Sequence, residues 1–319
     1  MKCMIAILLV LSLHTAGVSQ QISFEGFIDY QVEIKSKSKL TSDETLKTLS
    51  GYGNTLRVYI KKGKYYRVSG IVEEYVGLLP KENIIKYKNR DTLYKIPDTT
   101  HHGENIQVKR NDKNTVIANY NCKSIRLISK NETEEYFYTP ELVQLATDNP
   151  NISGTSFHRF LLETNAIWLK HVSESPEYLI TYTATRVQQQ IVDDKLLQPP
   201  ALPETLLEFE HLIEKAAPKS EKDWIAYMQR TVKAELANKH LKIPKGEKSI
   251  KQTVIVEFIV TSTGAIGEVW VQNAKEVHPA LAKEAIRVIK EGYGWKPATF
   301  LGKKIDALAR QPVTFMSTY

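Results

Sequence analysis

Histidine is the residue type that most often binds metals or moves protons, and four of the eight histidines are candidates for such chemistry. His101 and His102 are adjacent in a polar stretch, and adjacent side chains rarely point at one ion. His158 and His171 flank the apolar segment 160–162 and have no carboxylate or thiol at metal-ligand spacing. The first pair is predicted to be solvated, and the second pair to lie in the core or on the surface.

Neighbouring carboxylates are a second source of acid–base chemistry. Glu134 and Glu135 are adjacent, as are Asp193 and Asp194, and adjacent side chains on a strand point to opposite faces. This geometry does not suit the paired carboxylates of a glycosidase. No serine-hydrolase, zinc-protease or Walker motif is present, and segment 51–53 (Gly-Tyr-Gly) lacks the third glycine of a phosphate-binding loop. The sequence therefore predicts no enzyme, no cofactor and no metal site.

The composition limits the class of protein. The 319 residues are 42% hydrophobic and 25% charged, which is typical of a globular protein of about two domains. Two cysteines are too few for a disulfide scaffold. The formal net charge is +7, and residues 221–319 hold most of that excess, with 16 Lys and Arg against 10 Asp and Glu. This charge is expected to steer the C-terminal part towards an acidic peptide or the envelope surface, and export argues against nucleic acid as the partner.

The first residues have the pattern of an export signal. Lys2 precedes an unbroken apolar run at positions 4–11, and small residues follow this run. The run is too short to cross a bilayer, which needs about 20 apolar residues. The sequence predicts a signal peptide at 1–19 and a periplasmic location, with a retained, membrane-associated segment as the alternative. After cleavage Cys122 would be the only thiol, and a lone free cysteine is expected to be buried.

From about residue 24 to 192, short runs of alternating apolar and polar residues are separated by turn-forming residues. This pattern is typical of an antiparallel sheet, open or barrel-like. We therefore expect an antiparallel β-rich domain at 20–195. Pro199, Pro200 and Pro203 then mark a linker at 196–219, in which the apolar spacing over 204–217 favours a short helix.

The last hundred residues have a different pattern. Helical spacing of apolar residues begins at Trp224, and strand-like patterns follow at 254–260 and 265–272. A second helix is expected after Pro279, and a last strand at 309–316. Residues 220–319 therefore predict a helix, strand, strand, helix, strand unit.

This unit resembles the C-terminal domain of the TonB family. The features that carry the resemblance occur in the family's order: the strand at 254–260, the hairpin at 263–266, the helix segment at 282–288, Trp-Lys-Pro-Ala at 295–298, Gly-Lys at 302–303 and Pro-Val-Thr-Phe at 312–315. The matching fingerprint positions are Gly264, Ala285, Trp295, Pro297, Gly302 and Pro312. The resemblance covers about the last third of the chain.

The resemblance implies a periplasmic domain that binds outer-membrane proteins by pairing a strand with a short peptide, a mode known as β-augmentation. Arg310, Gln311, Val313 and Phe315 on the last strand are the residues predicted to contact the partner. A strand fully paired inside the sheet, or a homodimer through this strand, is the competing interpretation. The sequence lacks the long proline-rich spacer of the energy-transducing family member, so direct energy transduction is not expected.

The first domain has a weaker resemblance to exported GLPGLI-type and LolA-like β proteins. It rests on Asn-Tyr-Asn-Cys-Lys at 119–123 and on the aromatic strand at 135–140, although Asn119 replaces the expected glycine. The resemblance implies a curved sheet that holds an apolar or lipid-like group.

Together these patterns predict an α+β protein with an N-terminal antiparallel, half-barrel-like domain. Its C-terminal domain is expected to be TonB-like, with two helices and a three-stranded antiparallel sheet. The predicted function is docking of an outer-membrane transport or envelope partner by strand pairing. The alternative is a periplasmic carrier of a lipid or small ligand in the N-terminal domain, with the C-terminal domain as its docking handle.

Overall fold

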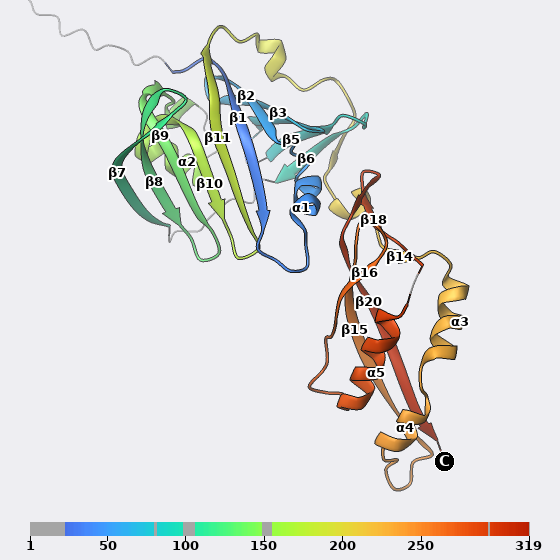
Figure 1. Cartoon of the computed structure of the whole chain (residues 1–319). Coiled ribbons are helices and arrows are strands. Elements are labelled where there is room, and N and C mark those ends of the chain that lie inside the picture. The colour runs from blue at the N-terminus through green and yellow to red at the C-terminus, as the bar shows by residue number, and fades with distance from the viewer. Residues whose placement is uncertain (1–22, 80–81, 98–105, 149–154, 293, 319) are drawn as a thin grey trace, which may run out of the picture.

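The computed structural model describes residues 23–79, 82–97, 106–148, 155–292 and 294–318. The N-terminal half is one large curved sheet, and the C-terminal half contains smaller sheets and three helices (Figure 1). The predicted signal peptide at 1–19 and the pair His101-His102 lie outside the described residues. Within the described part, no helix is long and apolar enough to cross a membrane.

The large sheet has twelve strands in the order β12-β6-β5-β4-β3-β2-β1-β11-β10-β9-β8-β7. All neighbours are antiparallel except β12 and β6. The strands are β1 (Gly26–Ser36), β2 (Thr55–Lys61), β3 (Lys64–Ser69), β4 (Val72–Leu79), β5 (Glu82–Tyr87), β6 (Leu93–Pro97), β7 (Gln107–Ile117), β8 (Tyr120–Ile128), β9 (Thr133–Val143), β10 (Ala166–Glu174), β11 (Tyr178–Gln189) and β12 (Glu204–Leu206).

Alternating side chains make one face of this sheet the main core. In β1, Ile28, Tyr30, Val32 and Ile34 are buried on that face, as a period of two requires. Helix α2 (Ser156–Thr164) packs into the same core through Phe160 and Leu161, while α1 (Asp43–Ser50) lies beside β1. Both helices begin at a hydroxyl cap, Ser42 for α1 and Thr155 for α2.

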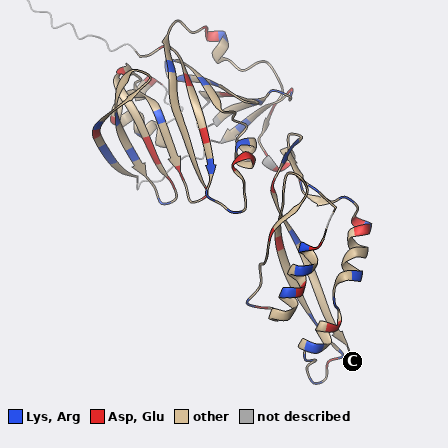
Figure 2. Ribbon diagram, viewed as in Figure 1, with Lys and Arg blue, Asp and Glu red and all other residues tan. Residues whose placement is uncertain are grey.

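The C-terminal half is built on a three-stranded antiparallel sheet in the order β16-β15-β20. Its strands are β15 (Ser249–Val260), β16 (Ile266–Val271) and β20 (Ala307–Thr318), and its helices are α3 (Glu221–Thr231), α4 (Glu235–His240) and α5 (Pro279–Lys290). Helix α5 buries Leu281, Ala285, Val288 and Ile289 against one face of the sheet. Lys and Arg lie on all three helices, interspersed with Asp and Glu (Figure 2).

Short strands of the segment between the halves pair with both of them, and the first, β12, pairs with β6 of the large sheet. β13 (Ile213–Glu214) pairs with β18 (Ala298–Phe300), which also pairs with β19 (Lys303–Ile305). β14 (Ala217–Pro218) pairs with β17 (Trp295–Lys296). A buried apolar cluster mixes Val72 and Tyr87 of the large sheet with Leu212, Phe300 and Ile305. The halves therefore share a small core.

The predicted α+β fold class is wrong. The chain is mostly β, with a twelve-stranded sheet that includes a parallel pair instead of a half-barrel-like antiparallel domain. The described residues hold five α-helices, three of them in the C-terminal half instead of two. The helix predicted at 204–217 is also absent, because this segment pairs with β6, β18 and β17 as β12, β13 and β14. The helical spacing of apolar residues in this segment is weak, and pairing with the edges of neighbouring strands outweighs it.

The third C-terminal helix arises from a break in the expected first helix. Helix α3 ends at Thr231, and α4 begins four residues later. Two side chains of α5 hold the backbone at the break: Arg287 donates to the Thr231 carbonyl at 2.9 Å, and Glu284 accepts from the Lys233 N–H at 3.1 Å. These bonds satisfy backbone groups that a continuous helix would have paired internally.

The Glu284–Arg287 pair makes stability depend on pH. The hydrogen bond from Arg287 holds the pKa of Glu284 below its ordinary value. A carboxyl group with a lower pKa in the folded state stabilises the fold above its unfolded pKa of about 4.3, and this contribution is lost as the pH falls through the folded-state pKa. We expect Glu284→Gln to lower the free energy of unfolding at pH 7, and the difference from the parent chain to shrink as the pH falls below the unfolded pKa. Urea melts at several pH values measure this.

Glu291→Gln is the control, because Glu291 pairs with the same Arg287 but is about half exposed. A Glu284→Gln deficit that persists unchanged at pH 3 would contradict the assignment.

Cys122 is fully buried, as expected. Burial raises the pKa of its thiol to about 11, so only about one thiol in a thousand is ionised at pH 8. In a Cys3→Ser chain we expect no reaction with a thiol reagent such as DTNB before denaturant is added, and one reacting thiol afterwards. Rapid labelling of the folded chain would contradict this. Val116→Cys with Cys122→Ser is the reactive control, because Val116 is 69% exposed.

Candidate functional site

The predicted partner-binding residues lie on β20, which is an edge strand. In the sheet order β16-β15-β20, one long side of β20 pairs with no described strand. Its other side pairs with β15 along its whole length, from Ala307 opposite Val260 to Thr318 opposite Ser249. The free side of β20, away from β15, is therefore unpaired, although α4 packs against the strand and Pro312 supplies no N–H there.

Backbone alternation identifies the residues of β20 that face this free side. Ile255 directs its backbone at β16: its N–H donates to the Asn273 side chain, and its carbonyl accepts from the Gln272 N–H, both at 2.9 Å. Pro312 lies opposite Ile255, so its backbone points away from β15 and towards the free side. The same direction applies to every second residue, namely Leu308, Arg310, Thr314 and Met316.

Two of the four predicted contact residues are in the core. The side chains of Val313 and Phe315 are 3% and 1% exposed and belong to the cluster beneath α5. Their backbone groups pair with β15. A partner beside β20 would therefore meet other residues.

The other two predicted residues are held by their neighbours. Gln311 accepts a hydrogen bond from Nε1 of Trp224 at 2.9 Å, which ties β20 to α3. Arg310 is exposed and forms an ion pair with Glu257 of β15 at 2.7 Å. Among the four, Arg310 alone presents a largely exposed side chain beside the free edge.

A groove runs along the first part of this edge. It has a volume of about 750 Å³ and lies between segment 213–218 and the β20 residues 307–311, with Trp295 among its lining residues. Leu308 of β20 and Ile225 of α3 also line it and are each about half exposed. The groove combines open backbone groups with apolar side chains.

The six fingerprint positions are structural. Ala285 and Trp295 are buried in the C-terminal core, and Pro297 separates β17 from β18. Pro312 faces the free side of β20, where its missing N–H leaves no ladder bond unmade. Gly264 and Gly302 have left-handed backbones, with φ of +85° and +81°.

Gly264 and Gly302 differ in the space around them. A Cβ on Gly264 would lie 2.6 Å from the Trp295 carbonyl oxygen, whereas a Cβ on Gly302 meets no atom within 4 Å. We expect Gly264→Ala to cost about 2–4 kcal/mol, since steric contact adds to backbone strain, and Gly302→Ala about 1 kcal/mol from strain alone. Equilibrium unfolding measures both. If both variants lose the same free energy of unfolding, the Trp295 carbonyl has moved away from the new Cβ at position 264, and the steric contribution is contradicted.

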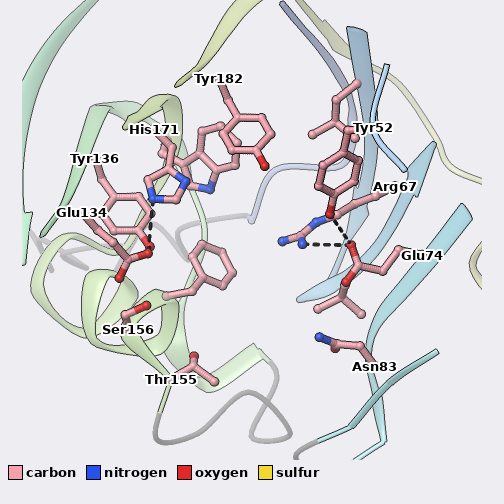
Figure 3. Close-up of a pocket in the computed structure, with 14 residues that line it drawn as sticks. Tyr52, Arg67, Glu74, Asn83, Glu134, Tyr136, Thr155, Ser156, His171 and Tyr182 are labelled. Atoms are coloured by element: carbon pink, nitrogen blue, oxygen red, sulfur yellow. Dashed lines mark hydrogen bonds and ion pairs between the residues drawn. The ribbon is translucent and has the colours of Figure 1, made fainter. Parts of the chain in front are cut away.

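A second candidate site is a cavity of about 250 Å³ within the curve of the large sheet (Figure 3). Residues from β2 to β5 form one wall, residues from β9 to β11 face them, and the start of α2 closes one side. The labelled polar lining residues are Tyr52, Arg67, Glu74, Asn83, Glu134, Tyr136, Thr155, Ser156, His171 and Tyr182.

An ion pair forms the first wall. Arg67 of β3 and Glu74 of β4 are direct cross-strand partners, and Nη1 of Arg67 donates to Glu74 at 3.2 Å. The Tyr52 hydroxyl lies 3.4 Å from the same carboxylate, whose charge is the main cause that raises the pKa of Tyr52. Only 8% of the Glu74 side chain and 25% of the Arg67 side chain are exposed.

A ladder of parallel rings forms the opposite wall. Tyr136, His171 and Tyr182 are direct partners across β9, β10 and β11. His171 stacks on Tyr136 with ring centroids 4.3 Å apart and on Tyr182 at 5.8 Å. The Tyr136 hydroxyl donates to Glu134 at 2.8 Å, and Nε2 of His171 lies 3.2 Å from that carboxylate, outside hydrogen-bond geometry.

The sequence analysis considered Glu134 and His171 separately, and it expected a ligand-holding curved sheet from a resemblance without assigning any lining residue. Glu134 and Glu135 do face opposite ways, since Glu135 bonds Arg126 on the other side of the sheet. One pattern in the sequence could have indicated the cavity: a charged residue at a position where the alternation of the strand predicts a buried side chain. Glu74 between Val72 and Val76 is an example.

The remaining candidates do not form a site. His158 lies on α2, where burial lowers its pKa, and Asp193 caps a short 3₁₀ turn. Within the described ranges, no group of three or more His, Cys, Asp or Glu side chains is placed to hold a metal ion.

No protein-family model matches the chain, and no curated protein matches it. Two solved structures of PNGF-II are similar over 75% of this chain, at 13% and 14% identity and TM-scores of 0.32 and 0.31. The chain spans less than half the length of these structures, 45% and 44%. A putative DNA polymerase III β subunit from Eubacterium rectale matches at 9% identity and a TM-score of 0.11, over 90% of this chain and 99% of its own. Similarity at this level carries no argument about fold or function.

Proposed function

We propose that this chain is an exported, periplasmic, TonB-like binding protein. It docks an outer-membrane transport or envelope partner by adding an extended, acidic segment of that partner to the free side of β20. The observation that carries the proposal is this unpaired side of β20, which is flanked by a groove at residues 307–311. Main-chain hydrogen bonds to β20 would supply affinity, and the groove would receive alternate side chains.

Two further observations support this function. Residues 221–319 carry a net positive charge, which favours an acidic segment and predicts that added salt weakens binding. The segment after Pro203 is pinned to both halves as β12, β13 and β14, so it does not serve as an extended spacer. This favours docking without direct energy transduction.

The test is a titration of the full chain with TonB-box peptides from outer-membrane transporters of the same genome, followed by fluorescence anisotropy. Leu308→Pro removes an N–H on the free side and leaves the ladder with β15 intact, so we expect it to weaken peptide binding at least tenfold. Leu308→Ala keeps the N–H and is expected to stay within about threefold of the parent chain.

Two results would overturn the proposal. One is the absence of peptide binding by a correctly folded chain, including the case in which β20 is occupied by a second copy in a homodimer. The other is equal binding by the Leu308→Pro and Leu308→Ala variants.

A further inference from the structure

The cavity of the large sheet has a mixed lining, in which polar groups are set among apolar surface and aromatic rings. Of its fourteen lining residues, only Leu56, Val76 and Phe157 lack a polar atom in the side chain. Burying a hydrocarbon against charged and hydroxyl groups leaves those groups without water or partners, which costs free energy. The volume of about 250 Å³ also lies just below the range of small-molecule pockets, about 300–1,000 Å³. A small polar ligand fits better than a lipid.

Arg67 and Glu74 form an ion pair within the cavity wall. A ligand with a carboxylate or phosphate group would have to draw Arg67 away from Glu74 in a partly buried site, and a cationic ligand would compete with Arg67 for Glu74. An uncharged ligand leaves this pair intact.

Groups on both walls remain open to hydrogen bonding. The hydroxyl of Tyr182 and the amide of Asn83 point into the cavity from opposite sides (Figure 3), and neither side chain has a hydrogen bond to another described residue. The Asn83 amide both donates and accepts, as does a hydroxyl group. The rings of Tyr136, His171 and Tyr182 stack face to face, so a ligand in the cavity contacts the edges of these rings, which carry their polar atoms.

We infer that this cavity binds a small, uncharged, polyhydroxylated molecule of about the size of a monosaccharide. Each ligand hydroxyl serves as donor to one wall and acceptor from the other. Tyr182 and Asn83 supply hydrogen bonds from opposite walls, and Nε2 of His171 lies buried in the same lining without a hydrogen-bond partner among the described residues. This inference does not depend on docking at β20.

Saturation-transfer NMR on the full chain tests it, with D-glucose, D-galactose, D-mannose and N-acetyl-D-glucosamine as probes. Glycine, L-lysine and sodium laurate serve as zwitterionic, cationic and acyl comparisons. We expect saturation transfer to at least one sugar, with affinity reduced at least tenfold by Tyr182→Phe and by Asn83→Leu. Tyr59→Phe is the matched control, because Tyr59 stacks on Tyr66 on the outer face of the sheet; it should bind as the parent does.

Circular dichroism and thermal melts establish that each variant is folded, and the two cavity variants are independent of each other. The inference is overturned if none of the four sugars binds, if only an amino acid or laurate binds, or if sugar binding is unchanged in both folded cavity variants.

Discussion

Phe300→Ala is expected to destabilise the chain by about 3–5 kcal/mol and to split its unfolding into two transitions. The Phe300 side chain is fully buried, and its ring meets Tyr87 of the large sheet edge to face, with centroids 6.0 Å apart. It is central to the cluster that joins the two halves. Its loss leaves a cavity at that junction, so each half should unfold more independently. Differential scanning calorimetry measures both effects.

Phe258→Ala is the matched control for this prediction. Phe258 is also fully buried, but it packs on Trp295 inside the C-terminal core. The same chemical change should cost a similar free energy without separating the transitions. If Phe300→Ala lowers the melting temperature but leaves one transition with equal calorimetric and van't Hoff enthalpies, the cluster does not couple the halves.

Glu74→Leu is expected to cost about 3 kcal/mol, because it leaves the charge of Arg67 without its partner in the cavity wall. The figure is at the low end for a buried ion pair, since a quarter of the Arg67 side chain is exposed. Urea unfolding of the folded variants measures the loss.

The pairing predicts that the effects of two substitutions are not additive. Arg67→Met with Glu74→Leu removes both charges and should recover most of the loss of Glu74→Leu alone. Asp112→Asn is the exposed control: Asp112 of β7 meets Lys123 of β8 at 3.2 Å, and the two side chains are 83% and 48% exposed, so its loss should stay below about 1 kcal/mol. Strict additivity of the double variant would contradict the pairing.

Local patterns located many elements but not their assembly. The strands expected at 254–260 and 309–316 lie within β15 and β20, and the helix expected after Pro279 is α5. Each has a strong period of apolar residues and a clear boundary. The segment 204–217 has neither, and its structure follows from the strand edges that β6, β17 and β18 offer. A sequence window contains no information about such distant partners.

The candidate sites divide in the same way. The resemblance to the TonB family predicted that residues of the last strand, β20, contact a partner. Which of these residues face the free side depends on the register between β20 and β15. In that register the side chains of Val313 and Phe315 are buried in the core. A ligand-holding sheet was expected from the weaker resemblance, but its lining was not, since Tyr182 lies far along the chain from Arg67 and Asn83.

By itself, the sequence determined the local periodicities, the apolar faces, the apolar run near the N-terminus and the basic C-terminal part, because each depends on residues close together in the chain. The tertiary structure alone decided the twelve-stranded sheet, the shared core between the halves, the free side of β20 and the polar cavity. The physical reason is that strands pair through backbone groups common to all residues, so side-chain patterns define a strand without naming its neighbour. Curvature and register then bring together side chains that no spacing in the sequence connects.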